Sequence, residues 1–212
     1  MTNISEIRKE YKLHQLDEAH MDKDPFKQFK RWLEEALHAK VQEPTAMSLS
    51  TISDEGKPTS RTVLLKEIYD DGFVFFTNYE SKKARHLDSN PNASLLFFWP
   101  EMERQVRIEG KVNRIASEES DKYFHSRPKE SKIGTWASPQ SQEIPDREYL
   151  NELKEKFEKR FESIMPKRPD TWGGYILMPV MFEFWQGRPS RLHDRLEYYL
   201  EKKEWKIRRL AP

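Results

Sequence analysis

Residues 47–115 contain several short stretches in which apolar and polar side chains alternate, and this pattern constrains the fold more than any other feature of the chain. It predicts strands at 47–52, 60–68, 73–77, 93–99 and 104–115. Most connections between these strands are too short for a crossover helix, so neighbouring strands are expected to run antiparallel. Several antiparallel strands around one shared core imply a barrel or a sandwich.

Helices are expected on the flanks of this sheet, which makes the chain mainly β with α-helices (α+β). Asp24 is expected to cap a helix beginning at Pro25, because apolar residues recur at helical spacing over 26–37. Ser81 and Ser117 are placed to cap shorter helices, and Pro145 to open a longer one. The polar residues 129–144 are expected to be irregular.

The domain organisation expected from these patterns is simple. Residues 1–23 carry few apolar anchors and are expected to form a mobile arm. Residues 24–212 are long enough for one domain with a full core and short for two.

Composition excludes several classes of function. The formal net charge is only +1, so no overall attraction to nucleic acid or acidic membranes is expected. There are no cysteines, which excludes disulfides, thiolate metal sites and a cysteine nucleophile. No apolar leader and no bilayer-length apolar run is present, so a cytoplasmic protein is expected. The six histidines show no close pairing, so no metal site is predicted.

The two halves of the stretch FEFWQGRPSRLHDR, residues 182–195, differ in composition: the first is rich in aromatic residues and the second in charged ones. Its first half, with the apolar residues before it, predicts a buried strand, and a closing hairpin is expected over 195–210. If residues 191–196 are extended, Arg191, His193 and Arg195 share one face. Two guanidinium groups and an imidazole repel one another unless something anionic or electron-rich lies against them. The pattern therefore indicates either a ligand site or a hydrated, charged sheet edge.

No Gly-rich phosphate loop occurs among the seven glycines. A phosphate would therefore have to be held by side chains through charge-assisted hydrogen bonds. Suitable groups occur in the strand RTVLLK (61–66), in the lysine pair 82–83 and after the third predicted helix at 127–131. Taken singly, each group also fits an ordinary solvated surface position.

The string Phe182, Glu183, Phe184, Trp185, Gln186, then four residues, then Arg191, Leu192, His193, Asp194, Arg195 resembles the signature of the pyridoxine (pyridoxamine) 5'-phosphate oxidases. The resemblance extends from about residue 7 to the terminal WKIRRLAP. It implies a split barrel of antiparallel strands with flanking helices, and a C-terminal region for dimerisation and substrate binding. It also implies a homodimer with FMN at the subunit interface.

The resemblance also implies a set of site residues. The FMN contacts would be Arg61, Thr62, Val63, Leu64, Leu65, Lys66, Phe76, Thr77, Lys82, Lys83, Gln105, Gln140, Ser141, Trp185 and Arg195. The substrate contacts would be Lys66, Tyr123, Arg127, Ser131, Arg191 and His193, with Arg8 and Tyr11 closing over the substrate. One departure is Lys82, where relatives usually carry arginine, because lysine lacks the planar fork for a bidentate phosphate contact.

The implied activity is oxidation of pyridoxine 5'-phosphate or pyridoxamine 5'-phosphate to pyridoxal 5'-phosphate by hydride transfer to FMN, with oxygen as acceptor. Arg191 and His193 would hold the reacting substituent, and whether His193 takes a proton stays open. Three alternatives remain at this point. They are a flavin reductase of the same fold, a non-catalytic FMN or pyridoxal phosphate carrier, and, least favoured, a nucleic-acid module.

Overall fold

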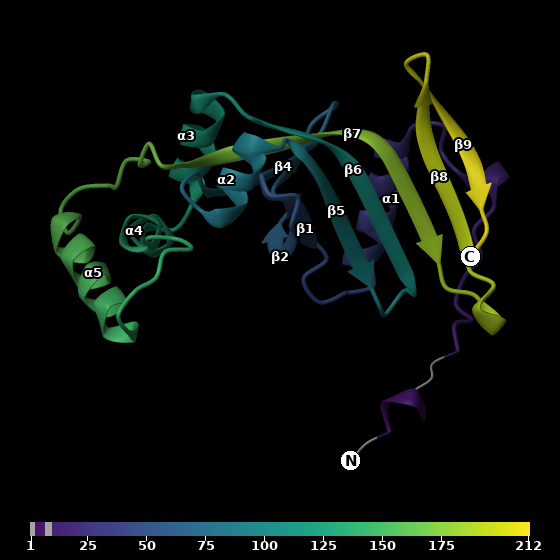
Figure 1. Ribbon diagram of the computed structural model, residues 1–212, viewed down its shortest axis with the longest axis horizontal. Helices are drawn as coiled ribbons and strands as arrows, with labels where there is room; N and C mark the ends of the chain where they lie inside the picture. The colour runs from purple at the N-terminus through teal and green to yellow at the C-terminus, as the bar shows by residue number, and fades with distance from the viewer. Residues whose placement is uncertain (1–2, 7–9) are drawn as a thin grey trace.

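The computed structural model describes residues 3–6 and 10–212, and their main feature is one curled antiparallel sheet (Figure 1). The strand order is β2-β1-β5-β6-β7-β4-β3, and β8 pairs with β7 and β9 with β8. The strands are β1 (Ala46–Ile52), β2 (Pro58–Leu64), β3 (Glu67–Ile68), β4 (Phe73–Asn78), β5 (Asn92–Trp99), β6 (Arg104–Arg114), β7 (Trp172–Gln186), β8 (Asp194–Glu201) and β9 (Glu204–Leu210). The predicted antiparallel, mainly β fold is confirmed.

Strand β7 organises the sheet because it is long enough to pair with three neighbours. Its first half pairs with β4, its second half with β8, and β6 runs along most of its length. The register between β6 and β7 shifts at Glu109 and Gly110. A Cβ at Gly110 would lie 2.1 Å from the carbonyl oxygen of Met178, so only glycine allows this close approach.

The helices lie around this sheet, as predicted for the flanks. They are α1 (Pro25–His38), α2 (Lys82–Ser89), α3 (Ser117–Ser126), α4 (Lys129–Ala137) and α5 (Arg147–Arg160), with short 3-10 turns η1 (Ile4–Glu6), η2 (Glu18–His20) and η3 (Pro189–Arg191). The predicted cap of α1 is confirmed, since the Asp24 side chain accepts a hydrogen bond from the backbone N–H of Phe26. This helix buries Phe29, Trp32 and Ala36 in the core.

Two expectations about the strands and loops were wrong. The strand predicted over 60–68 is divided, because Leu65 donates its N–H to Thr45 while Lys66 donates to Val74 of β4. The chain thus leaves β1 and joins β4 at this point. The segment expected to be irregular contains α4, which is stabilised by burying Ile133 and Ala137.

The expected helix caps at Ser81 and Ser117 were also wrong in detail. Ser81 occupies the N-cap position of α2 but makes no capping hydrogen bond, because its hydroxyl accepts from Lys83. Ser117 lies inside α3, whose N-cap position is Ala116, and its hydroxyl accepts from Arg168. Ser81 therefore makes a local contact with a neighbouring side chain, and Ser117 makes a tertiary one.

A single cluster of buried apolar residues runs from Leu16 to Tyr198 and includes Phe73, Phe97 and Phe184. Within residues 3–6 and 10–212, no helix combines the length and apolar character needed to cross a membrane. Helix α5 lies at the outer end of the molecule, packs against α4 and buries none of its own residues (Figure 1).

Candidate functional site

A cavity of about 550 Å³ lies where β2, β4, α3 and α4 meet. It is lined by Arg61, Thr62, Val63, Leu64, Lys66, Phe76, Thr77, Asn78, Lys83, Tyr123, Arg127, Ser131, Gly134, Thr135, Ser138, Gln140 and Trp172. Among the described residues of this lining, four side chains are cationic and none is a carboxylate. The cavity is therefore electrostatically suited to an anionic ligand.

Lys83 is the most perturbed cation of the cavity. Its ammonium group donates to the hydroxyl of Thr77 (3.0 Å), the hydroxyl of Ser81 (3.2 Å) and Oε1 of Gln140 (3.1 Å). Burial, together with the positive charge of Arg61, lowers the pKa of Lys83 to about 8. Since none of its three oxygen partners is charged, an anion in the cavity would stabilise the protonated form.

Hydrogen bonds to residues of β1 and β2 hold the side chain of Arg61 in place. Its guanidinium group donates to the carbonyl oxygen of Leu49 (3.0 Å) and to the hydroxyls of Thr51 (2.7 Å) and Thr59. Burial lowers the pKa of Arg61, yet an arginine keeps its charge at physiological pH. The bonds to neutral oxygens position this charge without cancelling it.

Three aromatic rings form one wall of the cavity. The rings of Phe76 and Tyr123 stack with centroids 3.9 Å apart, and Trp172 lies nearly parallel to Phe76 at 5.4 Å. Burial raises the pKa of Tyr123 despite the nearby charge of Arg127, so its hydroxyl keeps its proton and can donate.

Arg127 faces the cavity from the end of α3. Its guanidinium group donates to the hydroxyl of Thr135 (2.7 Å) and the carbonyl oxygen of Ser131 (3.1 Å), and it lies 4.7 Å from the ring centre of Trp172. The first turns of α4 therefore hold this guanidinium group in place beside the aromatic wall.

A second group of expected site residues lies in one row across β6, β7 and β8. Gln105 pairs with Trp185 and Trp185 pairs with Arg195, so their side chains share a face of the sheet. Arg195 donates twice to Glu183, through Nε (3.0 Å) and Nη2 (3.0 Å). Burial alone would raise the pKa of Glu183, but hydrogen bonds from Arg195 and Arg107 hold it below its ordinary value.

Residues 191–196 do not form one extended segment, so the condition under which Arg191, His193 and Arg195 would share one face is not met. Ser190 and Arg191 have positive φ angles (57° and 61°) in the turn η3, and β8 begins only at Asp194. Arg191 is exposed and does not share a strand face with His193 and Arg195. The carboxylate of Glu183, one of the residues that sequence reasoning missed, supplies the negative charge that was expected of a ligand beside Arg195.

His193 nevertheless joins the second group. Its ring lies 4.8 Å from that of Trp185, and the ring of Tyr11 lies 5.7 Å from both. The backbone N–H of Arg188 donates to Nδ1 of His193 (3.1 Å). Nδ1 is thereby an acceptor, so the ring proton is on Nε2, which makes Nε2 a donor.

The cavity lining thus includes many of the expected site residues: Arg61, Thr62, Val63, Leu64, Lys66, Phe76, Thr77, Lys83, Tyr123, Arg127, Ser131 and Gln140. Leu65 is buried behind it, whereas Lys82 and Ser141 are exposed and not part of its lining. Arg8 lies outside the described residues. Sequence reasoning also missed Trp172 and Thr135, whose residue types carry no specific signal.

The two groups lie at opposite ends of β7 (Figure 1). Trp172 lines the cavity and Trp185 belongs to the second group. They are thirteen positions apart in the strand, which corresponds to roughly 40 Å along it.

Comparison with known proteins identifies the chain. The family described as "Pyridoxamine 5'-phosphate oxidase" matches residues 33–154, and "Pyridoxine 5'-phosphate oxidase C-terminal dimerisation region" matches residues 172–212. The chain belongs to the pyridoxamine 5'-phosphate oxidase family. It is 51% identical over 213 residues to the pyridoxine/pyridoxamine 5'-phosphate oxidase of Cupriavidus taiwanensis, and 49% identical over 210 residues to that of a Cyanothece species. These alignments cover 100% and 99% of both chains, respectively, so the protein is an enzyme of this family.

Solved structures of relatives support the assignment of the fold. PhzG from Burkholderia lata, in complex with tetrahydrophenazine-1-carboxylic acid, superposes with a TM-score of 0.87 at 34% identity, covering 92% of this chain and 95% of that one. A pyridoxamine 5'-phosphate oxidase-related, FMN-binding protein from Nostoc punctiforme superposes with a TM-score of 0.71 at 18% identity, covering 91% and 100%. The architecture is thus shared with this family of split barrels.

Proposed function

We propose that this protein oxidises pyridoxine 5'-phosphate and pyridoxamine 5'-phosphate to pyridoxal 5'-phosphate, with FMN as cofactor and oxygen as acceptor. The observation that carries the proposal is the carboxylate-free cavity, in which four cations accompany a wall of stacked aromatic rings. Such a lining suits flat ligands that carry phosphate, and both FMN and the substrates are of this kind.

The residues present fit FMN. Arg61 and Lys83 would hold its phosphate, supported by Thr77 and Gln140, which already bond to Lys83. When bound, FMN supplies the redox chemistry, accepting a hydride from the substrate 4'-carbon and passing the electrons to oxygen. The chain supplies binding, orientation and the placement of charge.

The substrate phosphate would be held by Lys66, Tyr123, Arg127 and Ser131. Arg127 is already oriented by Thr135, and Tyr123 can donate its hydroxyl proton. Fixing the phosphate at one end restricts the position of the pyridine ring and its 4'-substituent, which lowers the entropy cost of the reaction.

The second group, with Trp185, His193, Arg195 and Tyr11, would complete the site from another copy of the chain. A small ligand cannot span the length of β7, so one chain alone cannot bring both groups to it. A two-fold homodimer would solve this by placing the second group of each copy over the cavity of the other. In that position His193 would donate Nε2–H to the substrate, because Nδ1 is occupied by the N–H of Arg188.

A spectroscopic experiment tests the activity. FMN-reconstituted protein would be mixed anaerobically with pyridoxine 5'-phosphate, and the visible flavin band recorded before and after air is admitted. Bleaching, followed by recovery with release of pyridoxal 5'-phosphate, is expected. Flavin binding without bleaching by either phosphorylated substrate would contradict the proposal and favour a reductase or a carrier.

A complementation experiment tests the shared site. Arg127→Ala damages only the cavity, and His193→Ala damages only the second group. Random pairing of the two variants should produce hybrid dimers with one intact site each, and thus about a quarter of wild-type activity in the mixture. A mixture no more active than the separate variants would contradict a site shared between copies.

A second candidate substrate class follows from PhzG, which was solved with a reduced phenazine carboxylic acid. Such a ligand carries a carboxylate in place of a phosphate. Oxidation of tetrahydrophenazine-1-carboxylic acid with no turnover of the phosphorylated substrates would favour this candidate.

A further inference from the structure

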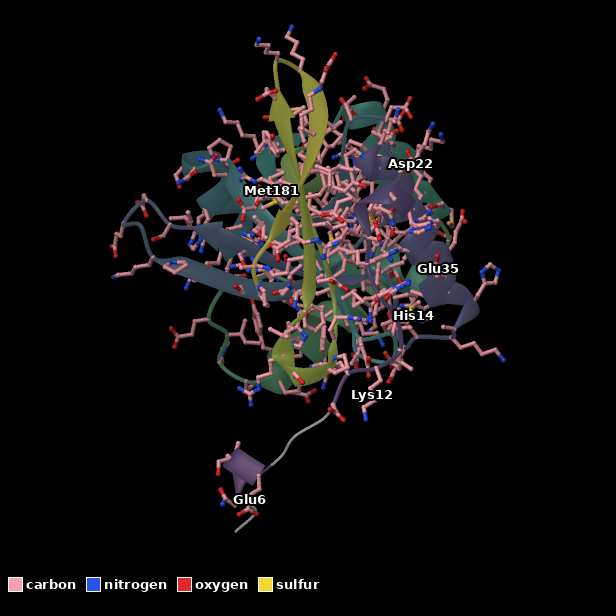
Figure 2. The ribbon with its side chains drawn as sticks, turned by 90° about the vertical axis from the view of Figure 1, so that its right-hand side faces the viewer. Glu6, Lys12, His14, Asp22, Glu35 and Met181 are labelled. Carbon is pink, nitrogen blue, oxygen red and sulfur yellow. The ribbon has the colours of Figure 1, made fainter. Side chains whose placement is uncertain are left out.

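The segment just before α1 lies along the end of the sheet, and several of its contacts are made by its own backbone. Figure 2 shows Glu6 standing away from the body of the molecule, whereas Lys12 and His14 lie against it. The N–H of Leu16 donates to Asp194 (3.0 Å), and Arg188 donates to the carbonyl oxygen of His14 (3.2 Å). These contacts do not depend on which side chains the segment carries.

Glu103, in the turn between β5 and β6, holds this segment through two hydrogen bonds to its backbone, which together are called the clamp. Its Oε2 accepts from the backbone N–H of Lys12 (2.8 Å) and of Leu13 (3.1 Å). The residue is only 3% exposed, so its carboxylate depends on hydrogen-bond donors from the protein. Two of these donors come from the residues that directly follow Tyr11.

The backbone of Glu103 also bonds to the end of β7, close to the second group of site residues. Its carbonyl oxygen accepts from the N–H of Gly187 (2.8 Å) and from Nε2 of Gln186 (3.1 Å). Its φ angle is +55°, a conformation that costs free energy for any residue but glycine. A glycine at this position would relieve the strain but could not clamp the segment.

The ring of Tyr11 fits against this end of β7 because residue 187 is a glycine. A Cβ at Gly187 would lie 2.7 Å from Cγ and 2.8 Å from Cβ of Tyr11. Trp185 and His193 contact the same ring edge-on. Gly187 therefore leaves room for Tyr11, and the hydrogen bonds from the N–H groups of Lys12 and Leu13 to Glu103 hold the backbone that follows it.

We propose that Glu103 is a positioning residue for the reaction, which fastens the backbone at Lys12 and Leu13 and so holds Tyr11 against Trp185 and His193. It acts through Tyr11 and does not itself touch the substrate. This role rests on the proposed function, in which the second group closes the site. Fixing Tyr11 before substrate arrives reduces the ordering cost of binding, so the clamp acts mainly on substrate affinity.

The first test compares Glu103→Ala with Glu103→Gln in the holoenzyme. The alanine variant lacks the acceptor and should raise KM for pyridoxine 5'-phosphate about tenfold with a smaller change in kcat. The glutamine variant keeps an acceptor oxygen and should stay close to wild type. Glu101→Ala, which removes an exposed carboxylate from the same turn, should leave both constants unchanged.

A double-mutant cycle with Tyr11→Ala separates positioning from a general structural effect. If Glu103 acts through Tyr11, Glu103→Ala should have little further effect on KM once Tyr11 is removed. Independent, additive losses of affinity would overturn the proposal. Gly187→Ala provides a second variant, because its methyl group should displace Tyr11 and raise KM with Glu103 intact; an unchanged KM would also overturn it.

A substrate-free measurement keeps the clamp testable if the proposed function fails. Trypsin cleavage after Lys12, followed by intact mass spectrometry, should be about tenfold faster in Glu103→Ala than in wild type or Glu101→Ala, because the N–H groups at 12 and 13 lose their acceptor. Equal cleavage rates would overturn the clamp. Failure of wild type to oxidise pyridoxine 5'-phosphate would instead refute the proposed function, with the cleavage rates still deciding the role of Glu103.

Discussion

The affinity of this protein for FMN should fall as the pH rises from 7 to 9, because Lys83 loses its proton in this range. Burial and the charge of Arg61 lower its pKa to about 8. Its ammonium group is then about nine-tenths protonated at pH 7 and about one-tenth protonated at pH 9. If only the charged form binds the FMN phosphate well, the dissociation constant should rise about tenfold between these pH values.

Lys83→Met should remove this pH dependence together with part of the affinity. Loss of one charge-assisted hydrogen bond to phosphate corresponds to about 1.5–3 kcal/mol, or roughly 10–150-fold weaker binding at pH 7. Lys82→Met is the matched comparison, because it removes the same charge from the adjacent, exposed position outside the cavity lining. Titration of the apoprotein with FMN, followed by flavin fluorescence at pH 7, 8 and 9, measures all three proteins.

The reasoning would be refuted by a wild-type dissociation constant for FMN that does not change from pH 7 to 9, or by equal pH dependence in Lys83→Met.

The lowered pKa of Lys83 also has a consequence for the stability of the apoprotein. The pKa of Lys83 in the folded chain lies below its ordinary value of 10.5, so the folded state binds fewer protons than the unfolded state between about pH 8 and 10.5. This group therefore makes the free energy of unfolding rise with pH across that window.

Three further predictions concern other parts of the molecule. Arg127→Lys keeps the charge but loses the planar fork, so KM for the phosphorylated substrate should rise about tenfold while the FMN dissociation constant stays unchanged; steady-state kinetics and flavin titration check this. His193→Gln retains a donor near the position of Nε2 and should keep more kcat/KM than His193→Asn, and the reverse order would argue against Nε2 as the donor. Phe184→Ala removes a fully buried ring that packs against Trp32 and Tyr198, and should lower the free energy of unfolding in urea by about 3–5 kcal/mol; a loss below about 1 kcal/mol would contradict its place in the core.

Local sequence determined much of the fold. The period-two stretches, the short turns between them and the cap at Asp24 depend on neighbouring residues, and they were confirmed except at 60–68, where the chain passes from one strand to another. The hairpin of β8 and β9 was predicted for the same reason. The left-handed turn at Ser190 and Arg191 was missed, because neither is a residue type that favours positive φ.

Many residues of the cavity lining were expected from the family resemblance, but how they come together could not be predicted from the sequence. Lys82 and Lys83 are adjacent on α2 and point about 100° apart, so only one can face the cavity. Burial of Ala84 and Leu87 sets the rotation of that helix and selects Lys83. Which lysine enters the cavity is therefore decided by packing between segments distant in sequence.

The partners of the charged groups likewise separate what the sequence predicts from what tertiary packing decides. The sequence left open whether Arg195 faces a ligand or lies at a hydrated sheet edge, and β-sheet register places the carboxylate of Glu183 against it. It placed Tyr11 in the N-terminal segment, but only the folded chain brings Glu103 to the backbone beside it. The sequence thus determined which chemical groups this protein has and the elements that carry them. Tertiary structure alone decided which of them meet, because those contacts join residues up to 193 positions apart.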